Sequence, residues 1–198
     1  MTRLHYLAAL LYTGLCVVAL GAARFEPRPV EVLPQVWGGS AGPWFQSVRP
    51  FCNGVEVELT LRRSPPPSGL EGAGYAAACL ALAGRIDPAR EWILSVHPAE
   101  QYRAAGIVFR VGHPVADAGD DRAAGPIMDL VLEFWPNHYM ALYHAGMANF
   151  ALGDQRRAAA QLSEFLELYK AGDVWSRNAR SVLRLIAYPP AAPEPGSR

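Results

Sequence analysis

The sequence carries no net charge and almost no lysine. Its 198 residues hold 18 Lys and Arg against 18 Asp and Glu, and Lys170 is the only lysine. Proteins that bind a phosphate backbone concentrate basic residues on one face. The charge balance therefore argues against nucleic acid as a partner.

Motifs of the common catalytic sites are also missing. The chain contains no HExxH, no CxxC and no glycine-rich phosphate loop. These patterns are the usual sequence marks of zinc, redox and nucleotide chemistry. The sequence therefore predicts no enzymatic activity and no cofactor.

Charge is scarce at the amino terminus, where an apolar segment stands out. Arg3 is followed by an uncharged run from Leu4 to Ala23, which is long enough to cross a bilayer as a helix. The small residues Gly21-Ala22-Ala23 suit a signal peptidase, but the run is longer than the apolar part of a typical cleaved signal. Residues 1–25 are therefore predicted to be a signal peptide or a transmembrane anchor, with the remaining chain outside the cytoplasm.

Two further segments lack any periodicity. Residues 26–50 are rich in Pro, Gly and Trp, which predicts a linker. Residues 189–198 are rich in Pro and Ala, which predicts a disordered tail. The folded domain is expected to span residues 51–188, which is enough chain for one hydrophobic core.

Within this domain a pattern recurs every 34 or 35 residues. Gly84, Gly119 and Gly153 each open a polar turn. An alanine follows each glycine after five residues, and an apolar residue follows four positions later: Ala89, Ala124 and Ala158, then Ile93, Met128 and Leu162. Glycine ends helices, and alanine permits two helices to approach closely. The period predicts an all-α fold of repeated helical hairpins.

The copy from His138 to Tyr169 resembles the tetratricopeptide repeat. Gly146 and Ala148 stand where that family has Gly and Ala in its first helix, Gly153 stands at the turn, and Ala158 at the second-helix alanine. The resemblance implies a solenoid of helical hairpins that binds a protein or peptide partner. A closing helix is expected after Asp173, because a solenoid must cover its last apolar face.

The earlier copies are less regular. The first helix of the middle copy is expected at about Ala99 to Val111, followed by a longer loop that starts at Gly112-His113-Pro114. Before the first copy, Val55 to Leu61 alternates as a strand would, although Val57 and Leu61 also have helical spacing. The repeat register favours a helix there.

Four apolar side chains share one face of the first helix in the final copy. They are Met140, Tyr143, Met147 and Phe150. A stripe of this kind is typical of a core face and also of a partner-binding groove. The groove interpretation makes Tyr143 and Phe150 the anchors of partner binding.

Cys52 and Cys79 are the two cysteines that follow the apolar segment. In an oxidising compartment they could form a disulfide, and the repeat register places their helices side by side. Two buried thiols fit the sequence equally well.

One polar cluster could hold a metal or an acid-base pair. It comprises His113, Asp117, Asp120, Asp121, Arg122, His138 and His144. His138 and His144 are six residues apart, which puts them on different faces of a helix, whereas such sites need convergent side chains. The sequence predicts that the aspartates cap a helix and pair with Arg122 in a solvated loop, that the histidines line ordinary helix surfaces, and that none of these residues binds a metal.

These features predict a membrane-targeted, extracytoplasmic scaffold for protein–protein interaction, in bacterial envelope assembly or secretion. Two alternatives stay open. One is a metal-dependent enzyme that uses residues 113–144, and the other is a purely structural subunit of a membrane complex.

Overall fold

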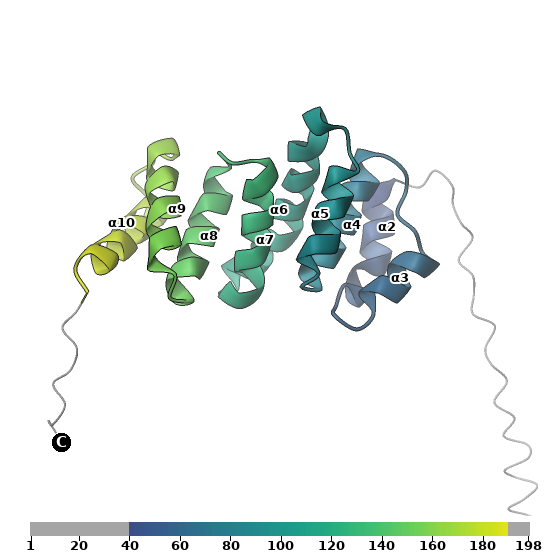
Figure 1. Cartoon of the computed structure of the whole chain (residues 1–198), viewed down its shortest axis with the longest axis horizontal. Coiled ribbons are helices and arrows are strands. Elements are labelled where there is room, and N and C mark those ends of the chain that lie inside the picture. The colour runs from purple at the N-terminus through teal and green to yellow at the C-terminus, as the bar shows by residue number, and fades with distance from the viewer. Residues whose placement is uncertain (1–39, 190–198) are drawn as a thin grey trace, which may run out of the picture. The chain divides into compact units, whose positions relative to one another are not determined.

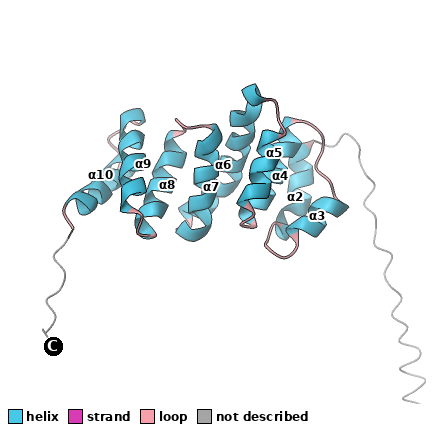
Figure 2. Ribbon diagram, in the orientation of Figure 1, coloured by secondary structure: helices cyan, strands magenta, loops and turns pink. Residues whose placement is uncertain are grey.

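The computed structural model describes residues 40–189, and all regular secondary structure in that range is helical (Figures 1 and 2). The predicted all-α class is confirmed. The predicted targeting segment and nearly all of the predicted tail lie outside the described residues. Between residues 40 and 189, no helix combines the length and the apolarity that crossing a bilayer requires.

The helices follow one another along the chain as a row of neighbours (Figure 1). Their bounds are α2 (Ala41–Val48), η1 (Arg49–Phe51), α3 (Val57–Arg63), α4 (Leu70–Leu82), α5 (Ile86–Leu94), η2 (Pro98–Glu100), α6 (Gln101–Asp117), α7 (Asp121–Phe134), α8 (Tyr139–Ala151), α9 (Gln155–Leu168) and α10 (Val174–Ala187). Three hairpins, α4–α5, α6–α7 and α8–α9, pack on their neighbours, and α10 closes the row against α8 and α9. This is a helical-hairpin solenoid with a C-terminal capping helix.

The three hairpins turn in the same way. Gly84, Gly119 and Gly153 have φ angles of 73°, 77° and 90°, a region that only glycine adopts easily. At each turn the glycine N–H donates to the carbonyl three residues earlier, and the next N–H donates to the carbonyl five residues earlier. These bonds satisfy carbonyls at the end of the first helix. The glycines therefore stand at the hairpin turns, where the period predicted them.

Small residues set the distance between paired helices. Ala89, Ala124 and Ala158 are all buried, one in the second helix of each hairpin. A Cβ added to Gly146 would stand 2.7 Å from Cγ of Leu162, and one added to Gly112 would stand 2.6 Å from Cγ2 of Ile127. Backbones can approach this closely only where a side chain is absent.

The middle hairpin is more regular than predicted. Helix α6 continues through Gly112-His113-Pro114 to Asp117, so the expected long loop is wrong. Pro114 lies near the end of α6, where the helix loses only one backbone hydrogen bond to it. Gly112 precedes Gly119 by seven residues, as Gly146 precedes Gly153, so both hairpins share one register.

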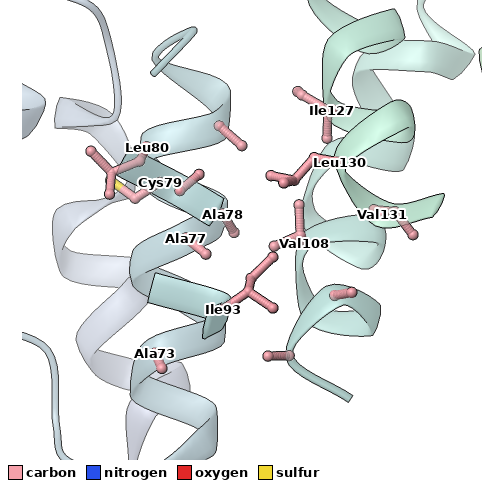
Figure 3. Packing of buried hydrophobic residues seen from close by; sticks show 14 of the residues in the cluster. Ala73, Ala77, Ala78, Cys79, Leu80, Ile93, Val108, Ile127, Leu130 and Val131 are labelled. Carbon is pink, nitrogen blue, oxygen red and sulfur yellow. The ribbon is translucent and has the colours of Figure 1, made fainter. Parts of the chain in front are cut away.

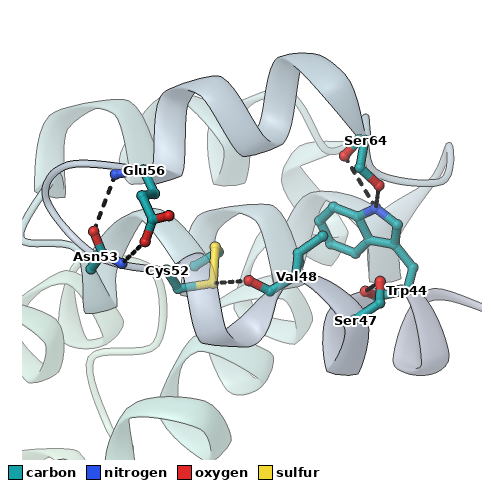
Figure 4. The surroundings of a disulfide bond; sticks show 8 residues. Trp44, Ser47, Val48, Cys52, Asn53, Glu56 and Ser64 are labelled. Carbon is teal, nitrogen blue, oxygen red and sulfur yellow. Dashed lines mark hydrogen bonds between the residues drawn. A yellow bond between two sulfur atoms is a disulfide. The ribbon is translucent and has the colours of Figure 1, made fainter. Parts of the chain in front are cut away.

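The domain also begins earlier than predicted. Helix α2 lies inside the segment 26–50 that was expected to be a linker, and its Phe45 and Val48 are buried in the core. Trp44 donates from Nε1 to the carbonyl oxygen of Ser64 at 3.2 Å, which ties α2 to the end of α3 (Figure 4). The segment that begins at Val57 is helix α3 rather than a strand, as the repeat register favoured.

Buried apolar side chains form two clusters. The larger gathers residues of α2 to α8, and Figure 3 shows alanines of α4 facing Val108 of α6 and Ile127 and Leu130 of α7. The smaller joins α8, α9 and α10 through Leu142, Tyr143, Leu162, Phe165, Ala179 and Val182. The closing helix therefore completes the core of the last hairpin.

Candidate functional site

The predicted binding stripe on α8 belongs to the smaller core cluster. Tyr143 is only 4% exposed, and its ring lies 5.2 Å from that of Phe165 between centroids. Met140, Met147 and Phe150 are half-buried against the same cluster. Helix α10 packs on this side of α8, so Tyr143 is a core residue, whereas the other three side chains of the stripe keep part of their surface exposed.

Cys52 and Cys79 form a disulfide (Figure 4). The bond joins the end of η1 to α4, with the two Cα atoms 4.8 Å apart. Both side chains are buried. Sγ of Cys52 lies 3.5 Å from the carbonyl oxygen of Val48, but a disulfide sulfur has no proton to donate, so this is a packing contact. Of the two sequence interpretations, the structure has the bridge rather than two thiols.

Two histidines and an aspartate converge between the second and third hairpins. His113 and Asp117 are one turn apart on α6, and His144 lies on α8. The Nε2 atoms of His113 and His144 are 2.9 Å apart. Oδ1 of Asp117 lies 3.5 Å from Nε2 of His113 and 3.8 Å from Nε2 of His144. The prediction that the histidines line ordinary helix surfaces and that the aspartates lie in a loop is therefore wrong for His113, His144 and Asp117.

The cluster is buried on one side and open on the other. His144 is 5% exposed, whereas the side chain of Asp117 is 47% exposed. Burial lowers the pKa of His144 to about 4, with a further lowering from His113 and an opposing effect of Asp117. His144 is therefore a neutral imidazole at pH 7, with one of its two ring nitrogens unprotonated.

Aromatic rings enclose the buried side of the cluster. The ring of Phe109 stacks on His113 with centroids 4.8 Å apart, and Trp175 of α10 lies 5.8 Å from the ring of His144. Three helices thus contribute to the walls: α6, α8 and α10.

His138 lies next to this cluster, but its side chain caps a helix. Its Nδ1 accepts a hydrogen bond of 3.2 Å from the backbone N–H of Ala141, which caps the start of α8. Burial lowers the pKa of His138, so it too favours the neutral form. Asp120 caps α7 by accepting from Ala123 N, as the sequence predicted for the aspartates.

The register of the repeats contained only part of the signal for the histidine pair. Aligning Gly112 with Gly146 places His113 and His144 on the first helices of consecutive hairpins, close to the equivalent glycines. Spacing along a single helix, by which His138 and His144 were compared, cannot detect contacts between neighbouring helices.

A second feature is a row of aromatic side chains at the end of the hairpins away from the glycine turns. The row consists of Tyr102, Trp135, His138, Tyr139 and Tyr169, from the start of α6 to the residue after α9. Successive ring centroids lie 5.7, 4.6, 6.2 and 5.3 Å apart. Tyr102 and Tyr139 are 46% and 44% exposed, so the row presents aromatic area to solvent.

No family model matches this chain, and neither the curated proteins nor the solved structures include a match to it.

Proposed function

We propose that this chain is a membrane-targeted, extracytoplasmic scaffold of the tetratricopeptide-like kind, which holds a protein partner. The observation that supports this most is the shared register of three hairpins, each closed at an equivalent glycine. In such a stack each repeat contacts its neighbours only, so its surface is extended and suited to holding another chain.

The aromatic row is the surface that best fits a partner. Aromatic residues are enriched at protein interfaces, because they supply a large contact area at a low cost in side-chain entropy. Tyr102 and Tyr139 are both nearly half exposed to solvent. They belong to different hairpins, α6–α7 and α8–α9. A partner that covered both would therefore bridge two repeats.

The disulfide supports the proposed compartment. Disulfides persist in oxidising environments such as the periplasm and are rare in the cytosol. Cys52 and Cys79 are joined here, and the apolar run from Leu4 to Ala23 supplies a route across a membrane. Fusing alkaline phosphatase after Arg198 tests the location, because this enzyme is active only where its own disulfides form. An inactive fusion would contradict the proposed location.

The partner surface is tested by paired affinity captures from solubilised membranes. The full chain carries a C-terminal tag, and the Tyr102→Ala/Tyr139→Ala variant is compared with Tyr188→Ala, whose tyrosine is 81% exposed and lies outside the row. Anchors of this kind are worth about 2 kcal/mol or more each, so we expect the double variant to lose the co-purified protein. Tyr188→Ala should retain it. Retention by both variants would reject the aromatic row as the partner surface.

Two other functions make different predictions. A purely structural subunit would co-purify in fixed stoichiometry with a complex and would be lost from it only on unfolding. A metal-dependent enzyme on residues 113–144 is favoured by the convergence of His113, Asp117 and His144. Such an enzyme first requires that the cluster bind a metal.

A further inference from the structure

The His113–Asp117–His144 cluster consists of the ligand types that zinc prefers. Zinc takes imidazole nitrogens and carboxylate oxygens in tetrahedral sites. One ligand atom from each of these residues lies within 4.8 Å of the others. Among the described residues, 40–189, it is the one group of three His, Cys, Asp or Glu side chains whose ligand atoms lie this close together.

The separations of the ligand atoms suit one small ion. Zinc bonds of about 2.0 to 2.2 Å in a tetrahedron place the ligand atoms about 3.3 to 3.6 Å apart. The observed separations of 2.9, 3.5 and 3.8 Å lie on both sides of that value.

The polarity of the cluster also points to a cation. His144 directs Nε2 toward His113 and Asp117 from a position that is 95% buried, since its exposure is 5%. The hydrogen bond between the two Nε2 atoms uses one proton, and Asp117, whose side chain is 47% exposed, brings a negative charge to the same point. A divalent ion would balance that charge and occupy both nitrogen lone pairs.

From this geometry we propose that His113, Asp117 and His144 bind a zinc ion that joins the second hairpin to the third. His113 and Asp117 contribute from α6 and His144 contributes from α8, so the ion links consecutive repeats. The exposed side of Asp117 leaves a fourth position open to water or to a group from the partner. The inference does not depend on the scaffold function, and each can fail separately.

Zinc binding by the full chain is the direct test. The protein is purified without a polyhistidine tag, stripped with EDTA and titrated with zinc by calorimetry, with cobalt as a spectroscopic substitute. We expect one zinc per chain and a cobalt absorption spectrum typical of tetrahedral coordination. Thermal melts should also show stabilisation that grows with zinc concentration, because the ion binds the folded state.

Two ligand variants and one matched control locate the site. His113→Gln and Asp117→Asn remove ligands whose side chains are 31% and 47% exposed, so circular dichroism should report a preserved fold. Each should weaken zinc binding by at least about 100-fold, since even residues that only support a ligand contribute 10- to 100-fold. His97→Gln changes an exposed histidine outside the cluster and should leave binding unchanged. Absence of saturable binding, or binding that survives both ligand variants, would mean a hydrogen-bonded histidine pair only.

Discussion

The ring of Tyr143 packs edge-on against the indole of Trp175, with centroids 5.0 Å apart. This contact connects α8 to the closing helix α10, and the neighbouring ring of Phe165 brings in α9. One tyrosine therefore contacts every helix of the carboxyl-terminal end. Its burial explains why the last hairpin needs a capping helix.

Replacing Tyr143 should destabilise the fold rather than weaken partner binding. Truncating a large buried aromatic residue costs about 3 to 5 kcal/mol, because it leaves a cavity as well as losing contacts. Tyr143→Ala should therefore lower the urea midpoint strongly. Tyr188→Ala is the control, since that side chain is 81% exposed and should change the free energy of unfolding by less than about 0.5 kcal/mol. Similar midpoints for both variants would contradict the packing of α10 on α8.

The close approach of α8 and α9 gives a second test. A Cβ on Gly146 would meet Cγ of Leu162 at 2.7 Å and its backbone nitrogen at 3.3 Å. The side chain could move but the backbone could not, so Gly146→Ala should cost about 1 to 3 kcal/mol. A methyl group added to Gly172, which lies between α9 and α10, would have nothing within 4 Å, so Gly172→Ala should change the free energy of unfolding by less than about 0.5 kcal/mol. Urea melts of both variants would decide it, and a tolerated Gly146→Ala would refute the close crossing.

The disulfide should contribute measurably to stability. It closes a loop with a sequence separation of 27 residues, which corresponds to about 3 to 4 kcal/mol when unfolded-chain entropy dominates. Adding dithiothreitol should lower the urea midpoint of the natural chain. The Cys52→Ser/Cys79→Ser variant should melt at that lower midpoint with or without the reductant. Recovery of both cysteines as free thiols by non-reducing peptide mapping would dismiss the bridge.

The parts of the fold that follow from local chemistry were the predictable ones. A positive φ at Gly153 and a small side chain at Ala158 are each required by one turn or one crossing, so they leave a periodic trace in the sequence. Helix α2 left no such trace, because Gly42 and Pro43 resemble a linker. Pro43 lies in the first turn, where the backbone N–H groups have no partner within the helix, so the helix loses nothing there.

The histidine pair could not be predicted from periodicity alone. Its formation depends on how far α6 and α8 rotate about their own axes, and that rotation is set by packing across α7 and α10. The two histidines are 31 residues apart, which is not the repeat period of 34 or 35, so no column of equivalent positions contains both. The same reasoning applies to Tyr143 on α8, whose burial depends on the position of α10.

The buried histidine predicts a loss of stability in mild acid. In the unfolded chain His144 titrates near its ordinary pKa of 6.5, whereas in the folded protein its pKa is about 4. Between these values the unfolded state binds more protons, so the free energy of unfolding falls as the pH drops from 6.5 toward 4. A difference of this size corresponds to about 3 kcal/mol once the pH is well below 4, of which about 2 kcal/mol is lost by pH 5. Urea melts of EDTA-treated protein at about pH 7.5 and about pH 5 measure it, and His144→Gln should show a weaker dependence, with a remainder from His138. Equal midpoints of the natural chain at both pH values would show that His144 is not buried as a neutral base.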